Sequence, residues 1–391
     1  TDEVFYLSSN GYLIKLNLEN VSETGQLPAG LMPWGAASCD GHIYFTDFGS
    51  DQLFDFNPKD KALNKVNLNK IFLGTQSIEL YTKPVDETIK KTPIQKTFEK
   101  VFKPKAEPEK YNPLSEPLEI AKHNKKLGAG SVSCNQNYVF VVGTLTQHVD
   151  VLDREKLETV ASFKVGERPS HVAISPDGKL IAITSTALNK VFIANANGDF
   201  SKKTEIDVLE GPTQIEWFNN NLLWVVNRGD GSISLLNNSS ASVEQTLKLD
   251  NALVNTIKVS PEENKIYALD GTNKNLFAID TQKFTFKTSS INEKLKFPNL
   301  LSVVGEHELL IASEPDGKIL ILNTQTLEPI KKIQTNLPPK AIVKLVEEVQ
   351  YAQIPKSAPK TTLEKNKITN PLEKKTEVET NSLSGPEFTT N

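Results

Sequence analysis

The sequence predicts an all-β protein, a seven-bladed β-propeller. Three observations predict this fold: a pattern of strand, turn, strand, loop and strand returns about every 42 residues, it can be followed seven times, and the last copy supplies a strand that the first lacks. The clearest copy, ERPSHVAISPDGKLIAITSTALNKVFIAN, begins at Glu167. It predicts strands over 170–174, 180–184 and 191–194, with a tight Ser-Pro-Asp-Gly turn after the first.

The two ends of the repeat array complete each other. Residues 3–7 (EVFYL) and 12–18 (YLIKLNL) predict a second and a third strand, with no first strand before them. After the seventh repeat, Pro338 to Leu345 (PPKAIVKL) predict a first strand with no second strand after it. We therefore expect the C-terminal strand to pair beside residues 3–7, which would close the ring and remove two exposed sheet edges.

The spacing of the repeats is regular except at one place. The small polar residues that end the predicted second strands are Ser8, Asp47, Gly143, Ser185, Asn227, Asp270 and Ser313. An Asx residue follows ten positions after six of them, at Asn57, Asp153, Asn195, Asn237, Asp280 and Asn323. Asx side chains there are expected to bond their own turns. Only the interval between Asp47 and Gly143 is long, which predicts an insertion.

Two segments lie outside the repeats. The propeller is predicted over residues 1–345, interrupted by a Lys/Pro/Glu-rich insertion at 71–127, and residues 346–391 are expected to form an extended or disordered tail. Both segments contain the tripeptide Asn-Pro-Leu in Lys/Glu-rich surroundings, which makes them candidates for docking a partner. The candidate residues are Asn112, Pro113, Leu114, Asn370, Pro371 and Leu372.

Charge and hydropathy narrow the possible partners. Forty-four Lys and Arg residues against 48 Asp and Glu residues leave a net charge of −4, which argues against nucleic acid or an anionic membrane surface as ligand. No apolar run approaches the roughly 18–20 residues that a membrane span needs, so membrane association is expected only through partners. A strand pattern that begins almost at Thr1 is typical of an exported chain without its signal.

The repeat resembles the YVTN-type β-propeller repeat, in which a Pro-led strand, a Ser-Pro-Asp-Gly turn and two further strands follow one another. The segments at Pro169 and Val254 carry the resemblance most clearly, and it covers residues 2–345 apart from the insertion. It implies a bacterial secreted or cell-envelope propeller, in the periplasm or at the cell surface, that often serves as an interaction platform. Neighbouring propeller groups include lactonases, a streptogramin lyase and amine dehydrogenase subunits.

Side chains near the predicted channel mouth are the candidates for ligand binding. In a propeller the loops that lead into the first strands and those that join second to third strands share one face. Candidate residues on this face are Trp34, Asp47, His171, Arg228, Asp270 and Glu314. Because the equivalent positions of other blades hold Ser, Gly or Asn, we expect no convergent metal cage, no catalytic residue and no cofactor.

His171 and the two cysteines are expected to have structural surroundings rather than a catalytic or metal-binding role. One His without a paired Ser or Cys supports neither a transition-metal site nor a triad, so a hydrogen-bonded His in the channel wall is the favoured interpretation. Cys39 and Cys134 occupy the same turn position in adjacent blades. At that radius we expect adjacent blades to be too far apart for the Cα separation of about 4.4–6.8 Å that a disulfide needs.

The sequence thus favours a non-enzymatic scaffold or accessory subunit of a bacterial envelope assembly, which docks partner proteins through the propeller faces, the insertion and the tail. Two alternatives remain open. One is a propeller enzyme of the lyase or lactonase type, acting at the channel mouth. The other is a small-molecule or glycan-binding propeller that uses Trp34.

Overall fold

The computed structural model describes residues 3–68, 127–200, 202–249, 252–291, 295–305 and 307–347. Of the two units into which the chain divides, Thr1–Gln353 and Ile354–Asn391, only the first contains described residues. The insertion with Asn112, Pro113 and Leu114, and the tail with Asn370, Pro371 and Leu372, therefore lie outside the described residues.

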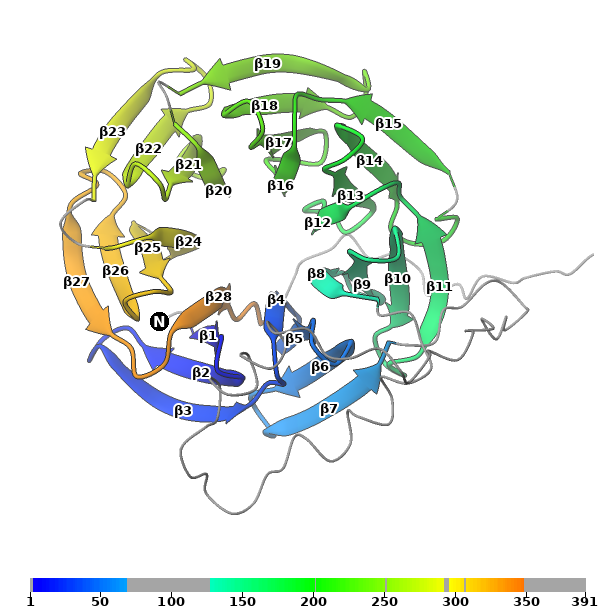
Figure 1. The fold of residues 1–391 in the computed structure, drawn as a ribbon, viewed down its shortest axis with the longest axis horizontal. Helices are drawn as coiled ribbons and strands as arrows, with labels where there is room; N and C mark the ends of the chain where they lie inside the picture. The colour runs from blue at the N-terminus through cyan, green and yellow to red at the C-terminus, as the bar shows by residue number, and fades with distance from the viewer. Residues whose placement is uncertain are drawn as a thin grey trace, which may run out of the picture. The chain divides into compact units, whose positions relative to one another are not determined.

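The described residues form seven four-stranded antiparallel sheets arranged as blades around a central opening (Figure 1). In ring order the inner strands are β28 (Pro339–Lys344), β4 (Pro33–Cys39), β8 (Ala129–Cys134), β12 (Pro169–Ile174), β16 (Pro212–Trp217), β20 (Val254–Ser260) and β24 (Pro298–Val304). The second strands are β1 (Val4–Ser8), β5 (His42–Asp47), β9 (Tyr138–Gly143), β13 (Leu180–Ser185), β17 (Leu222–Asn227), β21 (Lys265–Asp270) and β25 (Glu308–Ser313).

The two outer layers of each blade follow in the same order. The third strands are β2 (Tyr12–Asn17), β6 (Gln52–Asn57), β10 (His148–Asp153), β14 (Lys190–Asn195), β18 (Ser232–Asn237), β22 (Asn275–Asp280) and β26 (Lys318–Asn323). The fourth strands are β3 (Ser22–Pro28), β7 (Ala62–Asn67), β11 (Thr159–Lys164), β15 (Lys203–Asp207), β19 (Ser242–Lys248), β23 (Phe286–Ser290) and β27 (Pro329–Gln334). Blades are numbered here 1 to 7 in this order.

The ring closes as predicted. β28 pairs antiparallel with β1, with Val343 opposite Phe5 and Ala341 opposite Leu7. Figure 1 shows β28, in orange, as the inner strand of the blade that β1, β2 and β3 form, in blue. The first blade is therefore built from both ends of the repeat array. The edges of β1 and β28 that face each other are paired.

The Asx residues that end the third strands make the turns that their spacing predicts. In all seven blades the side-chain Oδ1 accepts a hydrogen bond from the backbone N–H two residues later, at 2.7–3.0 Å. Asn195 with Asn197 and Asp280 with Gln282 are examples. A side chain that satisfies its own turn fixes the connection to the fourth strand.

The hydrophobic core lies between the blades. Second and third strands are buried along most of their length, as in β13 and β14, whereas fourth strands such as β7 are largely exposed. Each core cluster joins neighbouring blades, and Ile193 of blade 4 packs in one cluster with Leu223 of blade 5. The described residues contain no helix whose length and hydropathy would allow it to span a bilayer.

Cys39 and Cys134 form a disulfide, so the expectation that they stay unpaired is wrong. Their Cα atoms are 6.2 Å apart, because the two cysteines end the inner strands β4 and β8, where adjacent blades are closest to each other. Gly35 makes the approach possible: a Cβ atom at this position would lie 2.9 Å from the carbonyl oxygen of Gly130. The expected separation of adjacent blades was therefore too large for these two inner strands.

Candidate functional site at the channel mouth

One face of the ring carries both sets of loops that the sequence analysis singled out, and we call it the mouth face. Inner strands run away from this face and second strands return to it, so the loops before the inner strands lie beside the loops between second and third strands. Hydrogen bonds join the two sets, as from Phe48 N to Met32 O at 2.9 Å and from Thr186 N to Arg168 O at 3.1 Å.

Asp47 and Asp270 are fully buried at the ends of their second strands and bind backbone groups. The Asp47 carboxylate accepts hydrogen bonds from Leu31 N at 3.1 Å and Met32 N at 2.5 Å. The Asp270 carboxylate accepts from Leu253 N at 3.0 Å and from the Asn273 side chain at 2.7 Å. Both carboxylates therefore hold the loop that leads into the inner strand of their own blade.

His171 lies half-buried in the channel wall and connects two blades. Its Nδ1 accepts a hydrogen bond from Ile215 N of the next blade at 3.5 Å. Ser131 and Gln214 occupy the same position of their own inner strands, and they accept from Val172 N at 3.2 Å and Ile257 N at 2.9 Å. This position thus bridges inner strands that are too far apart to pair directly.

The surroundings of His171 keep its imidazole neutral. Burial in the channel wall, and then the positive charge of Lys258, lower the pKa of His171 to about 3. Lys258 forms an ion pair with Glu216 of the preceding blade. No group of three or more potential metal ligands occurs among the described residues.

Three of the remaining candidates differ in their surroundings. Arg228 is exposed on the mouth face, and its backbone N–H donates to Gly211 O at 3.0 Å. Lys340, the second residue of β28, places its Nζ 3.6 Å from Glu314 Oε2 and 5.0 Å from the centre of the Trp34 ring. Lys340 thereby links blade 7, the closing strand and blade 2.

Trp34 belongs to an exposed cluster that we call the apolar patch, defined by Leu31, Met32, Trp34, Phe48 and Leu145. Met32, Trp34 and Leu145 expose 51%, 45% and 57% of their surface. The rings of Trp34 and Phe48 have centroids 5.4 Å apart. Exposed residues of this size and type rarely gather at one place on a protein surface without a function.

The apolar patch is continuous across the junction of blades 2 and 3. A Cβ atom on Gly128 would lie 2.7 Å from Leu145 Cγ and 3.1 Å from Phe48 Cε2, so both side chains meet over this glycine. The Cys39–Cys134 disulfide joins the inner strands of the same two blades. At the mouth end of these strands, Asp51 of blade 2 accepts hydrogen bonds from backbone N–H groups at the start of β8, which holds the two halves of the patch together.

Few charged residues occur in the described part of this sector of the mouth face. In blades 2 and 3 the described mouth-face loops are 29–32, 48–51, 127–128 and 144–147, and they contain one formally charged residue, Asp51. Asp51 is buried, and its carboxylate accepts from Leu127 N, Gly128 N and Ala129 N at 2.8–3.2 Å. The Asp51 carboxylate is thus bound to backbone N–H groups at the start of β8 and does not face a ligand on the mouth face.

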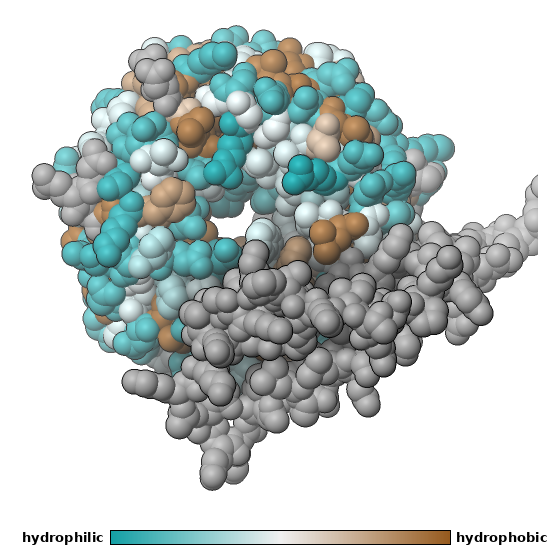
Figure 2. All heavy atoms as spheres, viewed as in Figure 1, coloured by the Kyte–Doolittle hydropathy of each residue, from teal (hydrophilic) through white to brown (hydrophobic). Residues whose placement is uncertain are grey.

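The other exposed hydrophobic residues fall into two groups. Along the mouth face the remaining blades contribute Leu188, Leu209, Leu253 and Phe297. The fourth strands contribute one residue per blade in five blades, namely Leu63, Val160, Val243, Phe286 and Ile330. Figure 2 views one end of the ring and shows hydrophobic residues gathered at separate points around the central opening, with hydrophilic residues between them. Isolated residues of this kind are ordinary, whereas the apolar patch joins five.

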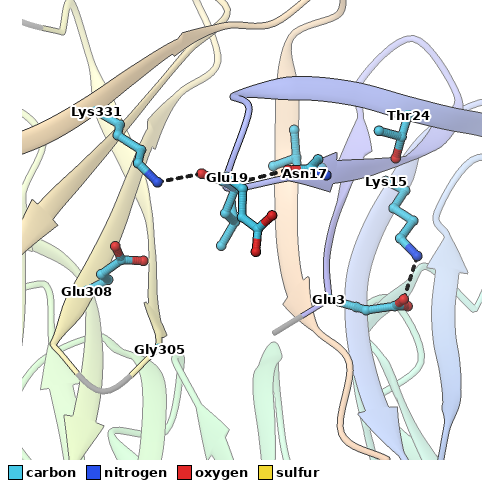
Figure 3. A pocket seen from close by; sticks show the side chains of 10 residues that line it. Glu3, Lys15, Asn17, Glu19, Thr24, Gly305, Glu308 and Lys331 are labelled. Atoms are coloured by element: carbon cyan, nitrogen blue, oxygen red, sulfur yellow. Dashed lines mark hydrogen bonds and ion pairs between the residues drawn. The ribbon is translucent and has the colours of Figure 1, made fainter. Parts of the chain in front are cut away.

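A separate pocket lies between blades 1 and 7, lined by Glu3, Lys15, Glu19, Glu308 and Lys331 among others (Figure 3). Lys15 Nζ is 2.6 Å from Glu3 Oε1, and Lys331 Nζ donates to Leu18 O at 2.7 Å. Both ammonium groups therefore bind groups of the protein itself.

Sequence reasoning identified Trp34 but missed its neighbours in the apolar patch. The available signal was composition: Leu31, Met32, Phe48 and Leu145 are large apolar residues inside predicted loops, where polar residues and Gly or Pro are usual. A single large apolar residue in a loop is unremarkable. Only the fold brings loops that are almost a hundred residues apart in sequence into one surface.

Comparison with known proteins supports the fold and leaves the family open. No protein-family model matches the sequence, and a search of curated proteins found no match. Solved structures are similar at the level of fold. A functionally unknown protein from Desulfotomaculum acetoxidans is 12% identical with a TM-score of 0.62, over 88% of this chain and 99% of that one. A streptogramin B lyase structure is 12% identical with a TM-score of 0.58, over 86% and 93%. The dihydro-heme d1 dehydrogenase NirN is 13% identical with a TM-score of 0.55, over 86% and 64%.

Proposed function

We propose that this propeller is a non-enzymatic interaction scaffold that binds a partner protein through the apolar patch on its mouth face. The observation that carries the proposal is the continuity of Leu31, Met32, Trp34, Phe48 and Leu145 across two blades. Depletion of charge with enrichment of aromatic residues and Met is the composition of protein-interface cores. The patch has this composition, and Asp51 of blade 2 joins its two halves by hydrogen bonds to the start of β8 in blade 3.

We further propose that the protein is exported and acts in a bacterial envelope assembly, as a relative of the YVTN-type propellers. The Cys39–Cys134 disulfide supports export, because such bonds persist in oxidising compartments. The amino-acid sequences of the repeats that begin at Pro169 and Val254 support the YVTN assignment.

An enzymatic role of the lyase or dehydrogenase kind has only the shared fold in its favour, since fold does not determine function. The candidate acids Asp47 and Asp270 bond to the backbone of their own loops. His171 is kept neutral and bridges two blades. These side chains, which acid–base chemistry at the mouth would use, thus accept hydrogen bonds from the protein's own backbone.

The test compares two matched double variants in quantitative affinity purification from native envelopes. The patch variant is Met32→Ser/Leu145→Ser, and the control variant, on the fourth strands, is Leu63→Ser/Ile330→Ser. We expect a stoichiometric partner to co-purify with the wild type and the control, and to be lost from the patch variant. Equal recovery of that partner with all three proteins would refute the proposal.

A further inference from the structure

We infer that the apolar patch binds a short extended segment of its partner, in which apolar anchor side chains stand next to an acidic residue that reaches Lys340. This inference rests on the proposed function and specifies the kind of partner. Three properties of the patch carry it: its size, its side-chain chemistry and the position of Lys340 at its border.

Size favours a short segment over a second folded surface. A stable interface between folded proteins buries roughly 800 Å² and 20–30 residues on each partner. The apolar patch consists of five side chains, and on the described mouth-face loops blades 4 to 7 each add one exposed large hydrophobic residue, such as Leu188 or Phe297. Binding of a second copy of this chain would need a continuous surface larger than the apolar patch. A peptide with two or three anchor side chains fits a surface of the size of the patch.

The side chains suit apolar anchors. Trp34 provides a large, rigid surface and is backed by Phe48. Met32 is unbranched and polarisable, so it adapts to anchors of different shape. Leu145 borders the patch from blade 3, and Gly128 beneath it leaves room for Phe48 and Leu145 to meet. Because the Asp51 carboxylate of blade 2 holds the start of β8 in blade 3, little ordering of the patch is required when a segment binds.

Lys340 gives the patch a preference for a bound segment that carries an acidic residue. Its ammonium stands 5.0 Å from the Trp34 ring centre, at the border of the patch, and 3.6 Å from Glu314. Both members of the ion pair are about 30% exposed, with side-chain values of 30% and 28%, so the pair is weak and can be shared with an incoming carboxylate. The described residues of the mouth-face loops of blades 2 and 3 include no exposed charged side chain. An acidic residue beside the anchors can therefore pair with Lys340 and share it with Glu314.

The test selects from a library of short random peptides displayed on phage, with the immobilised full chain as target. Enriched peptides are then measured by fluorescence anisotropy against four proteins: wild type, Trp34→Ser/Leu145→Ser, Lys340→Glu, and Leu63→Ser/Ile330→Ser as the matched control. We expect enriched peptides to combine aromatic or aliphatic residues with Asp or Glu. Affinity should fall about tenfold or more for the patch variant and remain unchanged for the control.

The Lys340→Glu variant tests whether Lys340 causes the preference for acidic peptides. A second selection on Lys340→Glu should yield apolar peptides that carry Lys or Arg in place of the acid. The inference is overturned if no peptide depends on the patch, if the selected peptides show no acidic preference, or if Lys340→Glu leaves that preference intact. It is also overturned if peptides bind only after residues 71–126 are deleted, which would assign the patch to that segment. Loss of the partner from the patch variant without peptide enrichment would retain the scaffold function and remove only this inference.

Discussion

Cys39 and Cys134 connect the inner strands of blades 2 and 3 by a disulfide, at a Cα separation of 6.2 Å. The bond lies in the same two blades that form the apolar patch, and 95 positions separate the two residues in the sequence. It therefore closes a long loop of chain and joins the two blades at the ends of their inner strands that point away from the mouth face.

Removal of the disulfide should lower stability. We expect Cys39→Ala/Cys134→Ala to lose about 2–5 kcal/mol of unfolding free energy, because the crosslink restricts the unfolded chain over a long loop. Guanidinium unfolding of the variant and the wild type measures the loss. Thiol labelling of the denatured, unreduced wild type should find no free thiol. Two reactive thiols, or equal stability of the two proteins, would contradict the crosslink.

Asp47 should be required for stability and for the shape of the patch. The Asp47→Ala variant leaves Leu31 N and Met32 N without their carboxylate acceptor, so we expect it to lose about 3 kcal/mol. Asp207→Ala is the control, because Asp207 is 86% exposed and its ion pair with Lys190 contributes little. Urea unfolding compares the three proteins. Stability of Asp47→Ala equal to that of the control would show that the carboxylate is free for a ligand.

His171 should make the protein acid-sensitive. Its pKa is about 3 when folded and about 6.5 when unfolded, so its contribution to stability is full above pH 6.5 and is lost as the pH falls toward 3. Since the side chain is half-buried, we expect a loss of about 2 kcal/mol by pH 4. His171→Gln should keep the stability at pH 7.5, because Gln214 makes the same bridge one blade further on.

The difference between wild type and His171→Gln, measured by chemical unfolding from pH 7.5 to pH 4, isolates this group from the carboxylates. The difference should be near zero at pH 7.5 and should favour the variant increasingly below pH 6.5. A difference that does not change with pH would exclude a depressed pKa for His171.

Asp150 should lower the stability of the protein as the pH rises, whereas His171 lowers it as the pH falls. It is buried in β10, accepts a hydrogen bond from Ser162 Oγ at 2.7 Å, and its Oδ2 has no partner among the described residues. Burial raises the pKa of Asp150 to about 6, so its contribution is most favourable below about pH 4 and is lost as the pH rises through 6. We expect Asp150→Asn to raise the free energy of unfolding, relative to the wild type, by about 2.5 kcal/mol more at pH 7.5 than at pH 4. A gain of the same size at both values would disprove the raised pKa.

The parts of the fold that follow from local spacing were predictable from sequence. The residues from Ser8 to Ser313 that end the second strands, and the Asx residues that end the third, recur at fixed intervals because each blade repeats one local geometry. Closure by β28 followed from the strand missing at the N-terminus. Distances between blades were not predictable in this way. The close approach of β4 and β8 depends on Gly35 meeting Gly130, a contact between residues far apart in the chain.

The site was predictable only in part, for a related reason. Trp34 stood out because an exposed Trp near a strand start is unusual. Asp47 and Asp270 were candidates for a ligand because they are acidic, but their partners are backbone N–H groups, which a sequence does not display. The apolar patch needs Phe48 and Leu145 to meet across two blades, and this contact exists only in the folded ring.

Site-specific photo-crosslinking in the native envelope tests the central claim, that the apolar patch is the surface that binds a partner. A photoreactive amino acid replaces Met32 or Leu145 in the patch, and Leu63 or Ile330 on the fourth strands as matched exposed apolar controls. We predict a single crosslinked partner from both patch positions and none from the controls. Crosslinks of equal yield at all four positions, or at the fourth strands alone, would contradict the account.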